Sequence, residues 1–463
     1  MLHPQQYKDR RVVVLGLAKS GVAVAETFRR LGADVVVNDK KERSLCPEAD
    51  GLSDLGISVI CGHHPEDLID EHTALVVKNP GIPYGIPPVR RALELGIEVV
   101  TEVEVACHLA VSPIIGITGS NGKTTTTTLV HLMLKEAGLG ALLAGNIGRA
   151  MTEAVLAASP EDWLVTELSS FQLKGTAHFR PRIACLLNLY ETHLDYHGSM
   201  EDYAASKAKL FANQTAEDTA VLNWDDSFCR KLVPELKAEL FPFSAKERLD
   251  KGVYLEGEKL VAADGSGAVT ELIAATELGI PGSHNVENAL AASAVALAAG
   301  ADPASIGRVL ATFQGVEHRL EFVRELDGVS FYNDSKATNP AASVKSIEAF
   351  GDRPVVLVCG GQERGSDYNE LFGAFRHAVR AVVVLGENRG AIAKVAAAAG
   401  IKEVETVEAE ENVQSTVQKA VEAASRLAHS GDVVLLSPAS ASWDMFPSYE
   451  VRGRMFKHSV HTL

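Results

Sequence analysis

The chain has 463 residues, a net charge of −16 and an apolar content of 46%, which predict a globular protein of about three domains at roughly 150 residues each. The negative charge argues against bulk electrostatic binding to nucleic acid or to an anionic membrane, and the longest apolar stretch, residues 289–299, is too short to span a bilayer. The 6 cysteines form no Cys-x-x-Cys pair and the N-terminus lacks a signal-peptide core, so we expect a cytoplasmic protein in a reducing compartment.

The first third of the chain alternates strand-like and helical patterns. A β-branched run at residues 11–17 leads into a helical stretch at residues 22–31. Further strand-like runs follow at residues 33–38, 57–61, 75–77 and 97–100. Because continuous apolar strands separated by helices are typical of parallel sheets covered on both faces, we expect an α/β domain here.

A glycine-rich turn follows the first predicted strand. Gly16, Ala18 and Gly21 stand in the spacing of a dinucleotide-binding motif, and Asp39 ends the next strand. Ala18 replaces the glycine that normally lets a pyrophosphate approach the backbone, whereas Ser20 adds a hydroxyl donor near the helix N-terminus. Two interpretations stay open at this point, a nucleotide-binding site and a tight turn between strand and helix.

The second third opens with the most specific motif of the chain. An apolar run at residues 114–117 enters a glycine-rich turn at residues 119–122, which ends in Lys123 and Thr124 and continues into a helical pattern. Backbone N–H groups of such a turn surround a phosphate, the lysine reaches the terminal phosphates, and the threonine hydroxyl binds Mg²⁺. The spacing is not that of Walker A, because Ile117 stands where that motif has its first glycine.

Polar side chains follow the later strands of this region. Strands are predicted at residues 163–168, 183–189 and 220–223. Glu167 stands near the carboxyl end of the first strand and is either a Mg²⁺ ligand or the N-cap of the next helix. His193 lies in a polar segment after the second strand, where a metal ligand, a phosphate partner and an ordinary loop histidine are all open interpretations. We also expect a small group of antiparallel strands at residues 241–280 and a packed helix at residues 285–299.

The last third begins near residue 317, at a joint that carries Arg319. Its strands are predicted at residues 329–332, 354–359, 381–385 and 432–436. A polar segment at residues 332–340 follows the first strand, and small hydroxyl residues at 437–444, which we interpret as a helix start, suit a carboxylate ligand. We therefore expect domains at residues 1–110, 111–316 and 317–463.

Taken in chain order, these motifs resemble the Mur ligase family along essentially the whole chain. The pieces that carry the resemblance are residues 119–124 (GSNGKT), 167–173 (ELSSFQL) and 333–339 (NDSKATN). The last piece points to the D-glutamate-adding branch, although a lysine-adding relative stays open. The resemblance implies an α/β chain with a Rossmann-like N-terminal domain that binds a UDP-sugar, a central P-loop-type ATPase domain with a parallel sheet, and a Rossmann-like C-terminal domain that binds the amino acid.

The resemblance also implies roles for single residues. ATP is expected at Gly119, Ser120, Asn121, Gly122, Lys123, Thr124, Thr125, Asn288, Arg319 and Asp334. The UDP-linked substrate is expected at Ser20, Asp39, Gly81, Asn146 and His193, and D-glutamate at Lys336, Thr338, Ser442 and Tyr449. Metal ligands are expected at Thr124, Glu167, His193 and Lys207, and catalytic residues at Lys123, His193 and Lys207.

One lysine carries a special expectation. Lys207 aligns with a lysine that is carbamylated in the family, and the added carboxylate would hold a second Mg²⁺ together with His193. The alignment needs a gap of one residue, so Lys209 is a weaker candidate. Two further positions depart from the family pattern, since Tyr449 stands where phenylalanine is common and Arg364 replaces a lysine near the amino acid.

The implied reaction joins D-glutamate to UDP-N-acetylmuramoyl-L-alanine, with ATP and through an acyl phosphate, for peptidoglycan synthesis. ATP and two Mg²⁺ ions are the expected cofactors, and we expect a monomer with no nucleic-acid or membrane partner. Another amide ligase of the superfamily, such as a folylpolyglutamate synthase, is the main alternative. Two further alternatives are a nucleotide-gated binding protein and an NAD-dependent dehydrogenase built on residues 11–39.

Overall fold

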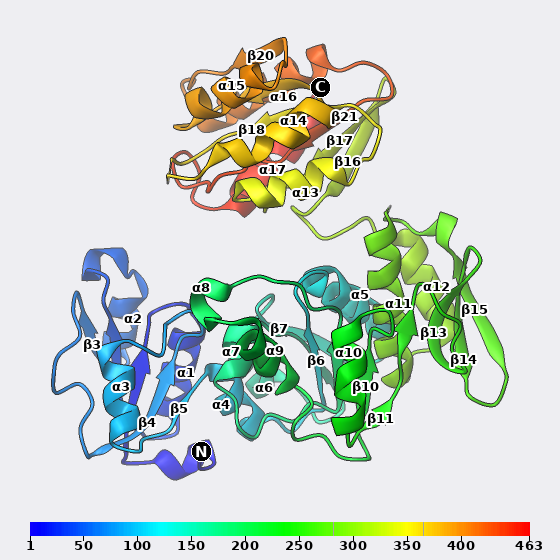
Figure 1. Cartoon of the computed structure of the whole chain (residues 1–463). Coiled ribbons are helices and arrows are strands. Elements are labelled where there is room, and N and C mark those ends of the chain that lie inside the picture. The colour runs from blue at the N-terminus through cyan, green and yellow to red at the C-terminus, as the bar shows by residue number, and fades with distance from the viewer. Residues whose placement is uncertain (281, 364) are drawn as a thin grey trace. The chain divides into compact units, whose positions relative to one another are not determined.

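The computed structural model describes residues 1–280, 282–363 and 365–463. The chain divides into two compact units, Met1–Phe313 and Gln314–Leu463, and each is described by itself (Figure 1). Arg364, for which a role near the amino acid is expected, lies outside the described residues. Among the described residues, no helix has both the length and the apolar character that a membrane span requires.

The first sheet has the strand order β3-β2-β1-β4-β5, and its neighbouring strands run parallel, as predicted. Its strands are β1 (Arg11–Leu15), β2 (Asp34–Asp39), β3 (Ser58–Cys61), β4 (Thr73–Lys78) and β5 (Val99–Val100). The helices of this region are α1 (Lys19–Arg30), α2 (Glu48–Asp54), α3 (Pro87–Glu94) and α4 (Glu102–Leu109). Because β1 pairs with both β2 and β4, the carboxyl ends of these strands meet at one edge of the sheet.

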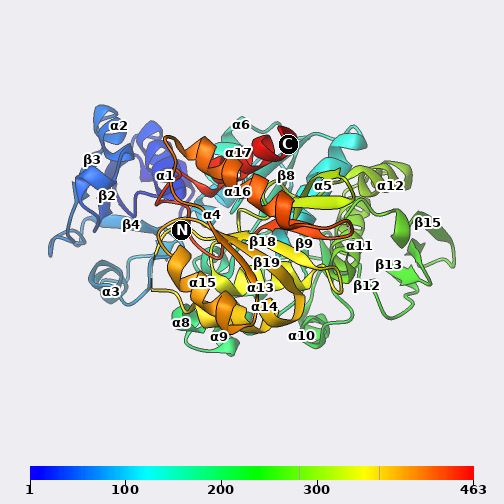
Figure 2. The ribbon, with the colours of Figure 1, turned by 90° about the horizontal axis from the view of Figure 1, so that it is seen from above.

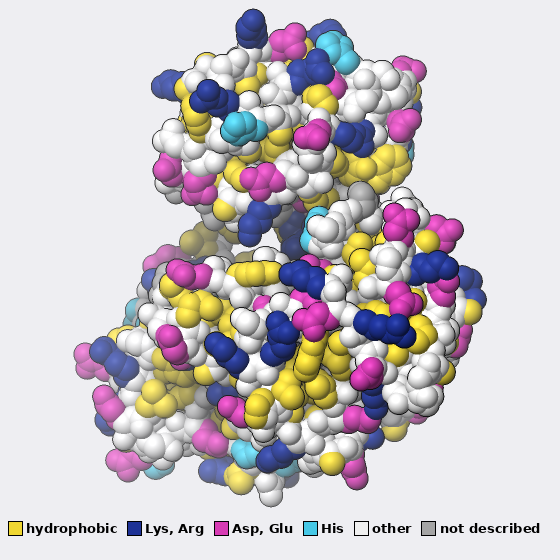
Figure 3. All heavy atoms as spheres, turned by 45° about the vertical axis from the view of Figure 1, so that its right-hand side comes forward, with side chains coloured by type: hydrophobic (Ala, Val, Ile, Leu, Met, Phe, Trp, Pro, Cys, Tyr) yellow, Lys and Arg dark blue, Asp and Glu magenta, His cyan; other side chains and the backbone are white. Residues whose placement is uncertain are grey.

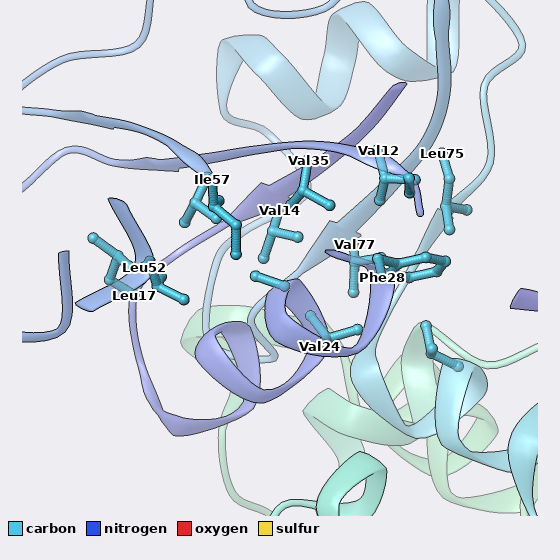
Figure 4. Close-up of a cluster of buried hydrophobic side chains, with 14 of the residues drawn as sticks. Val12, Val14, Leu17, Val24, Phe28, Val35, Leu52, Ile57, Leu75 and Val77 are labelled. Carbon is cyan, nitrogen blue, oxygen red and sulfur yellow. The ribbon is translucent and has the colours of Figure 1, made fainter. Parts of the chain in front are cut away.

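The side chains of β1 are buried on both faces of the sheet, because successive residues of a strand point to opposite sides. Val12 and Val14 pack with Phe28 of α1 on one face, as Figure 4 shows. Val13 packs on the other face, in a cluster that includes Val89 of α3. The uninterrupted apolar run in the sequence follows from this arrangement, since every residue of the strand after Arg11 is buried.

The central sheet has the order β11-β10-β9-β6-β8-β7 and is also parallel. Its strands are β6 (Ile114–Thr118), β7 (Ala141–Gly145), β8 (Trp163–Glu167), β9 (Ile183–Leu186), β10 (Thr219–Leu222) and β11 (Glu239–Leu240). The helices are α5 (Lys123–Glu136), α6 (Met151–Ala157), α7 (Ser170–Lys174), α8 (Leu194–His197), α9 (Met200–Ala208) and α10 (Ser227–Leu232). β6 lies between β8 and β9, so the segments that follow these three strands come together at one edge.

A smaller sheet follows, with the order β12-β13-β14-β15. Its strands are β12 (Phe243–Ser244), β13 (Lys251–Glu256), β14 (Lys259–Asp264) and β15 (Val269–Ala274), and the helices after it are α11 (Ser283–Ala298) and α12 (Pro303–Thr312). The antiparallel prediction is confirmed for β13 to β15 but is wrong for β12, which pairs with β13 in parallel. In Figures 1 and 2, β3 and β15 lie at opposite ends of the first unit, and α11 packs against α5.

The second unit contains a sheet with the order β16-β17-β21-β18-β19-β20. Its strands are β16 (Glu321–Leu326), β17 (Val329–Asn333), β18 (Val355–Cys359), β19 (Val379–Val384), β20 (Glu403–Thr406) and β21 (Val433–Leu436). The helices are α13 (Pro340–Glu348), α14 (Phe372–Ala378), α15 (Arg389–Ala398), α16 (Val413–Leu427) and α17 (Tyr449–His461). The edge strand β16 runs antiparallel to β17, so this sheet is mixed.

Residues 437–444 do not begin a helix, so that interpretation of the sequence is wrong. Ala439 has a φ of 57°, a left-handed conformation that an α-helix does not contain. The next helix, α17, begins at Tyr449, where the Ser448 side chain accepts a hydrogen bond from the backbone of Val451. The hydroxyl residues after β21 therefore belong to a loop.

Charged side chains of both signs are interspersed on the face of the molecule that Figure 3 shows. The net charge of −16 is therefore not gathered into one acidic patch on that face.

Candidate functional site

The phosphate-binding loop predicted from the sequence joins β6 to α5, whose first residue is Lys123. Gly122 precedes this helix with a φ of 81°, a left-handed conformation that favours glycine. A Cβ atom on Gly122 would lie 2.2 Å from Oδ1 of Asn288 on α11, so space also requires glycine here. The same oxygen accepts a hydrogen bond from the hydroxyl of Thr126 at 3.4 Å. The structure thus places Asn288, an expected ATP residue, against the loop.

The loop is held in shape by residues from other parts of the central sheet. The backbone N–H of Ser120 donates to the carbonyl of Asn188 at 3.0 Å, and the N–H of Asn121 donates to Oδ1 of Asn188 at 2.9 Å. The hydroxyls of Ser120 and Tyr203 share a hydrogen bond at 2.9 Å. Sequence analysis missed Tyr203, although it is an aromatic residue in a helix of mostly small and charged residues.

Two lysines converge on the loop. Nζ of Lys123 donates to the carbonyls of Gly119 and Ser120, at 2.9 Å each. Nζ of Lys207 donates to the carbonyl of Gly119 at 2.9 Å and to the hydroxyl of Thr118 at 3.2 Å. Lys207 is buried, and burial, followed by the charge on Lys123, lowers the pKa of Lys207 well below its ordinary value. A lowered pKa favours the neutral amine, which is the nucleophilic form.

Lys209, the weaker candidate for carbamylation, points to a different place. Its Nζ donates to the carbonyls of Lys174 and Thr176, at 2.7 and 2.8 Å. Of the two candidate lysines, Lys207 is therefore the one that contacts the phosphate loop.

Glu167 ends β8, next to the strand that leads into the loop. Its Oε1 accepts a hydrogen bond from the amide of Asn146 at 2.6 Å. Among the described residues, Oε2 of Glu167 is buried and has no hydrogen-bond partner. A buried carboxylate oxygen without a donor is costly unless a cation lies beside it, so Glu167 and the hydroxyl of Thr124 fit a Mg²⁺ ion. The capping interpretation of Glu167 is wrong, because the N-cap of α7 is Ser169.

His193 precedes α8 and has a φ of 58°, a strained conformation for a residue with a side chain. Its ring packs edge-on against Phe171 of α7, with the ring centroids 5.0 Å apart, and lies 6.3 Å from the ring of Tyr203 on α9. α7 follows the strand that carries Glu167, and α9 carries Lys207. The structure therefore places His193 against the helix that follows Glu167 and the helix that carries Lys207, and these are two of the three other expected metal ligands.

Three of the residues expected to bind the UDP-linked substrate, Ser20, Asp39 and Gly81, follow or end β1, β2 and β4, whereas Asn146 follows β7 and His193 precedes α8. The hydroxyl of Ser20 donates to Oδ1 of Asn79 at 3.0 Å, and Oδ2 of Asp39 accepts from the backbone N–H of Leu17 at 2.8 Å. Gly81 follows Asn79 in the loop after β4. Sequence analysis missed Asn79, which fixes the first glycine-rich turn against the loop after β4.

Lys78 ends β4 and is buried, and it too escaped the sequence analysis. Its Nζ donates to the carbonyls of Pro80 at 3.1 Å and Ile82 at 2.9 Å, and to the hydroxyl of Tyr196 on α8 at 3.1 Å. Burial, followed by the charge on Lys174, lowers the pKa of Lys78 to about 7. This lysine ties the loop after β4 to the helix that follows His193.

We expect the stabilisation that Lys78 provides to grow as the pH rises. The unfolded chain holds a lysine proton up to about pH 10.4, whereas folded Lys78 loses it near pH 7, so the unfolded state binds more protons between these values. The Tm of the wild type relative to Lys78→Met should therefore increase from roughly pH 6.5 to about pH 9. Thermal unfolding of both proteins checks this, with the exposed Lys237→Met as the control. A difference that stays constant or shrinks would mean that folded Lys78 keeps its proton.

In the second unit, Asp334 follows β17 and is buried. Its carboxylate accepts hydrogen bonds from the N–H of Leu320 at 3.2 Å and from the hydroxyls of Ser346 at 2.5 Å and Ser437 at 3.0 Å. Burial raises the pKa of Asp334 to about 6, against these hydrogen bonds and the charge on Arg319. Arg319 and Asp334, both expected at the nucleotide, thus lie close together within this unit.

The residues expected to bind D-glutamate lie in and beside the loops after β17 and β21. Nζ of Lys336 lies 5.7 Å from the ring centroid of Tyr449, whose carbonyl accepts a hydrogen bond from Ser335 at 2.8 Å. Ser442 is buried in the loop after β21, which pairs with β17, and Thr338 is exposed. An ammonium and hydroxyls at one edge of a sheet suit a carboxylate ligand.

Family models match three stretches of the chain. The model of the Mur ligase MurD-like N-terminal domain matches residues 10–101, that of the Mur ligase middle domain residues 117–296, and that of the Mur ligase glutamate ligase domain residues 318–440. The chain belongs to the Mur ligase family. Relatives named UDP-N-acetylmuramoylalanine–D-glutamate ligase support this: the protein of Geobacillus sp. (strain WCH70) is 50% identical over 457 residues, covering 99% of this Mur ligase and 98% of the relative.

A second relative with the same name, from Streptococcus pneumoniae (strain P1031), is 47% identical over 458 residues, or 99% of this Mur ligase and 98% of the relative.

Solved structures share the fold. The Mur ligase MurC of Thermotoga maritima has a TM-score of 0.58 at 20% identity, covering 98% of this chain and 99% of that one. MurF of Thermotoga maritima in complex with ADP has a TM-score of 0.52 at 19% identity, covering 100% and 97%. The chain has the three-domain architecture of Mur ligases.

Proposed function

We propose that this Mur ligase adds D-glutamate to UDP-N-acetylmuramoyl-L-alanine at the expense of ATP. The observation that carries the proposal is the convergence of Lys123 and Lys207 on the phosphate loop, beside a buried oxygen of Glu167 that has no hydrogen-bond partner among the described residues. These groups suit a triphosphate and its metal ion. The two substrates are those named in the relatives that are 50% and 47% identical over nearly the whole chain.

The proposed reaction has two steps. The alanyl carboxylate attacks the γ-phosphorus of ATP, which gives an acyl phosphate and releases ADP. The amine of D-glutamate then attacks the acyl carbon, and phosphate leaves as the amide forms. Because a carboxylate and a triphosphate repel each other, Lys123 and the N–H groups of the loop must orient and partly neutralise the phosphates. Mg²⁺, when bound at Thr124 and Glu167, supplies further neutralisation.

We infer that Lys207 is carbamylated and that a second Mg²⁺ binds there with His193. Carbamylation joins the neutral amine to the carbon of CO₂ and releases one proton, so a buried base becomes a carboxylate. The burial of Lys207, its lowered pKa and its contact with Gly119 all support this reaction. Hard oxygen ligands of this kind are the ones that Mg²⁺ prefers.

The remaining binding sites are assigned by domain. We propose a UDP-sugar domain at residues 1–110, an ATP domain at 111–316 and a D-glutamate domain at 317–463. The UDP-linked substrate would contact Ser20, Asp39, Gly81, Asn146 and His193. D-Glutamate would contact Lys336, Thr338, Ser442 and Tyr449, while Arg319 and Asp334 would complete the nucleotide site. We also infer a monomer in the cytoplasm, and sedimentation should then give a species of 49.4 kDa.

The test is ADP release by the purified protein with ATP, Mg²⁺ and UDP-N-acetylmuramoyl-L-alanine. We expect continuous ADP release only when D-glutamate is also present, and none with L-glutamate, because the enzyme stops after one equivalent of ADP unless the second step consumes the acyl phosphate. ADP release with another amino acid or another carboxylate acceptor would support the ligase mechanism but assign a different substrate. The protein would then act as another Mur ligase or as a folylpolyglutamate synthase. ATP binding without release under any of these conditions would contradict the proposal.

A further inference from the structure

Two histidines and a glutamate form a cluster outside the site described above. Glu104 and His108 are four residues apart on α4 and therefore share one face of the helix, whereas His178 comes from the connection between α7 and β9. Within residues 1–280, 282–363 and 365–463, this is the one group of three or more His, Cys, Asp or Glu residues whose ligand atoms all lie within 4.8 Å of one another.

Both imidazole rings converge on one carboxylate oxygen. Oε1 of Glu104 lies 3.3 Å from Nε2 of His108 and 3.0 Å from Nδ1 of His178. Neighbouring ligand atoms in a tetrahedral zinc site with bonds of about 2.0–2.1 Å are about 3.3 Å apart, so these spacings suit such an ion. The backbone N–H groups of Ala177 and His178 donate to the carboxylate at 3.0 and 2.9 Å, which fixes its orientation.

The cluster reaches the surface on one side. The side chain of Glu104 is fully buried, that of His108 is 21% exposed and that of His178 is 60% exposed, so a bound ion would keep a position open to water. Two positive groups oppose a cation here, because Lys209 interacts electrostatically with Glu104 and the N-terminal amine with His108. Two imidazole nitrogens beside a single carboxylate favour Zn²⁺ over Mg²⁺, whose ligands are mainly oxygen atoms.

We propose that Glu104, His108 and His178 form a Zn²⁺ site that clamps α4 to the connection between α7 and β9. The two rings bind the ion as neutral imidazoles, with the proton of His108 on Nδ1 and that of His178 on Nε2. α4 lies between the first sheet and the central sheet in the chain, and it packs against α1, α6 and α7. The ion would therefore brace the helix that connects the two sheets.

The test titrates the full-length protein with Co²⁺, a spectroscopic substitute for Zn²⁺, in excess Mg²⁺ so that oxygen-rich sites are filled. We expect one equivalent of Co²⁺ with the absorption bands of a tetrahedral site, and displacement of these bands by Zn²⁺. In His178→Ala and His108→Ala, the affinity for Co²⁺ should fall by at least about 100-fold. Loss of a residue that only orients a metal ligand already lowers metal affinity by about 10–100-fold. His72→Ala, which changes another exposed histidine of the first unit, is the matched control.

Thermal unfolding gives a second measure. Zn²⁺ should raise the Tm of the wild type and of His72→Ala but not that of His178→Ala. Because His178 is exposed, its truncation removes little packing, and this variant keeps the test valid if His108→Ala does not fold. Tetrahedral bands that persist at full affinity in His178→Ala, or no such bands in the wild type, would overturn the proposal and leave the cluster as a set of hydrogen bonds around Glu104.

Discussion

Replacement of Lys207 by alanine is expected to reduce turnover by about 10³-fold or more, because the lost ligand provides several kcal/mol of charge stabilisation. Lys207 is buried and contacts Gly119 of the phosphate loop and Thr118 at the end of β6, and in the proposed mechanism its carbamate holds a metal ion with His193. Added formate or acetate should restore part of the activity by placing a carboxylate in the space that the side chain leaves. The measurement is the rate of ADP release with both substrates, with and without the added carboxylate.

Lys209→Ala is the control for this variant, because Lys209 lies two residues away and donates to carbonyls outside the loop. It should retain most of the activity and respond little to formate. Labelling with ¹³C-bicarbonate should give a carbamate carbon signal in the wild type and in Lys209→Ala, but not in Lys207→Ala. Full activity of Lys207→Ala, with no response to a carboxylate, would remove the carbamate from the mechanism.

Replacement of Lys123 by alanine should reduce turnover by about 10²–10³-fold or more, the loss seen when one preorganised donor to developing charge is removed. Lys123 is the first residue of α5, and its ammonium donates to the loop carbonyls of Gly119 and Ser120. The side chain is not part of the hydrophobic core, so we expect little change in the circular dichroism spectrum or the Tm. ADP release and thermal unfolding measure the two effects separately.

Lys135→Ala is the matched control, because Lys135 is exposed in the last turn of the same helix. It removes the same charge from α5 without touching the loop. Normal use of ATP by Lys123→Ala would mean that the loop has only a structural role, and an equal loss in Lys135→Ala would attribute the effect to the helix as a whole.

The parallel sheets could be predicted from the sequence because their strands are buried on both faces and read as uninterrupted apolar runs. The strands that escaped prediction lack this signal. β7 is only partly buried and contains alanine and glycine, and no residue of β16 is fully buried. Edge strands of this kind take their conformation from the strand that they pair with. A local sequence pattern contains no information about that partner.

The residues of the candidate site also fall into those that the sequence pattern predicts and those that only the fold brings together. The loop at residues 119–124 could be predicted, because the spacing of its glycines and its lysine directly reflects the shape of a phosphate. The preference for Lys207 over Lys209 came from the family alignment and not from the local pattern, since residues two apart on a helix point about 200° apart around its axis and only the packing decides which one faces the loop. Lys78 could have been noticed as a lysine at the end of a buried apolar strand, but its partners Ile82 and Tyr196 become neighbours only in the folded chain.

The contact between Lys78 and Tyr196 limits how far this enzyme can be dissected into modules. The family models for the first and middle domains match separate stretches, residues 10–101 and 117–296, which invites the expression of the middle domain alone. Such a fragment would contain the phosphate loop, yet the helix after His193 would lose the lysine that anchors it. A truncated middle domain is therefore a poor substitute for the intact protein in inhibitor screens or nucleotide-binding assays, because the segment around His193 would lose its anchor in the first sheet.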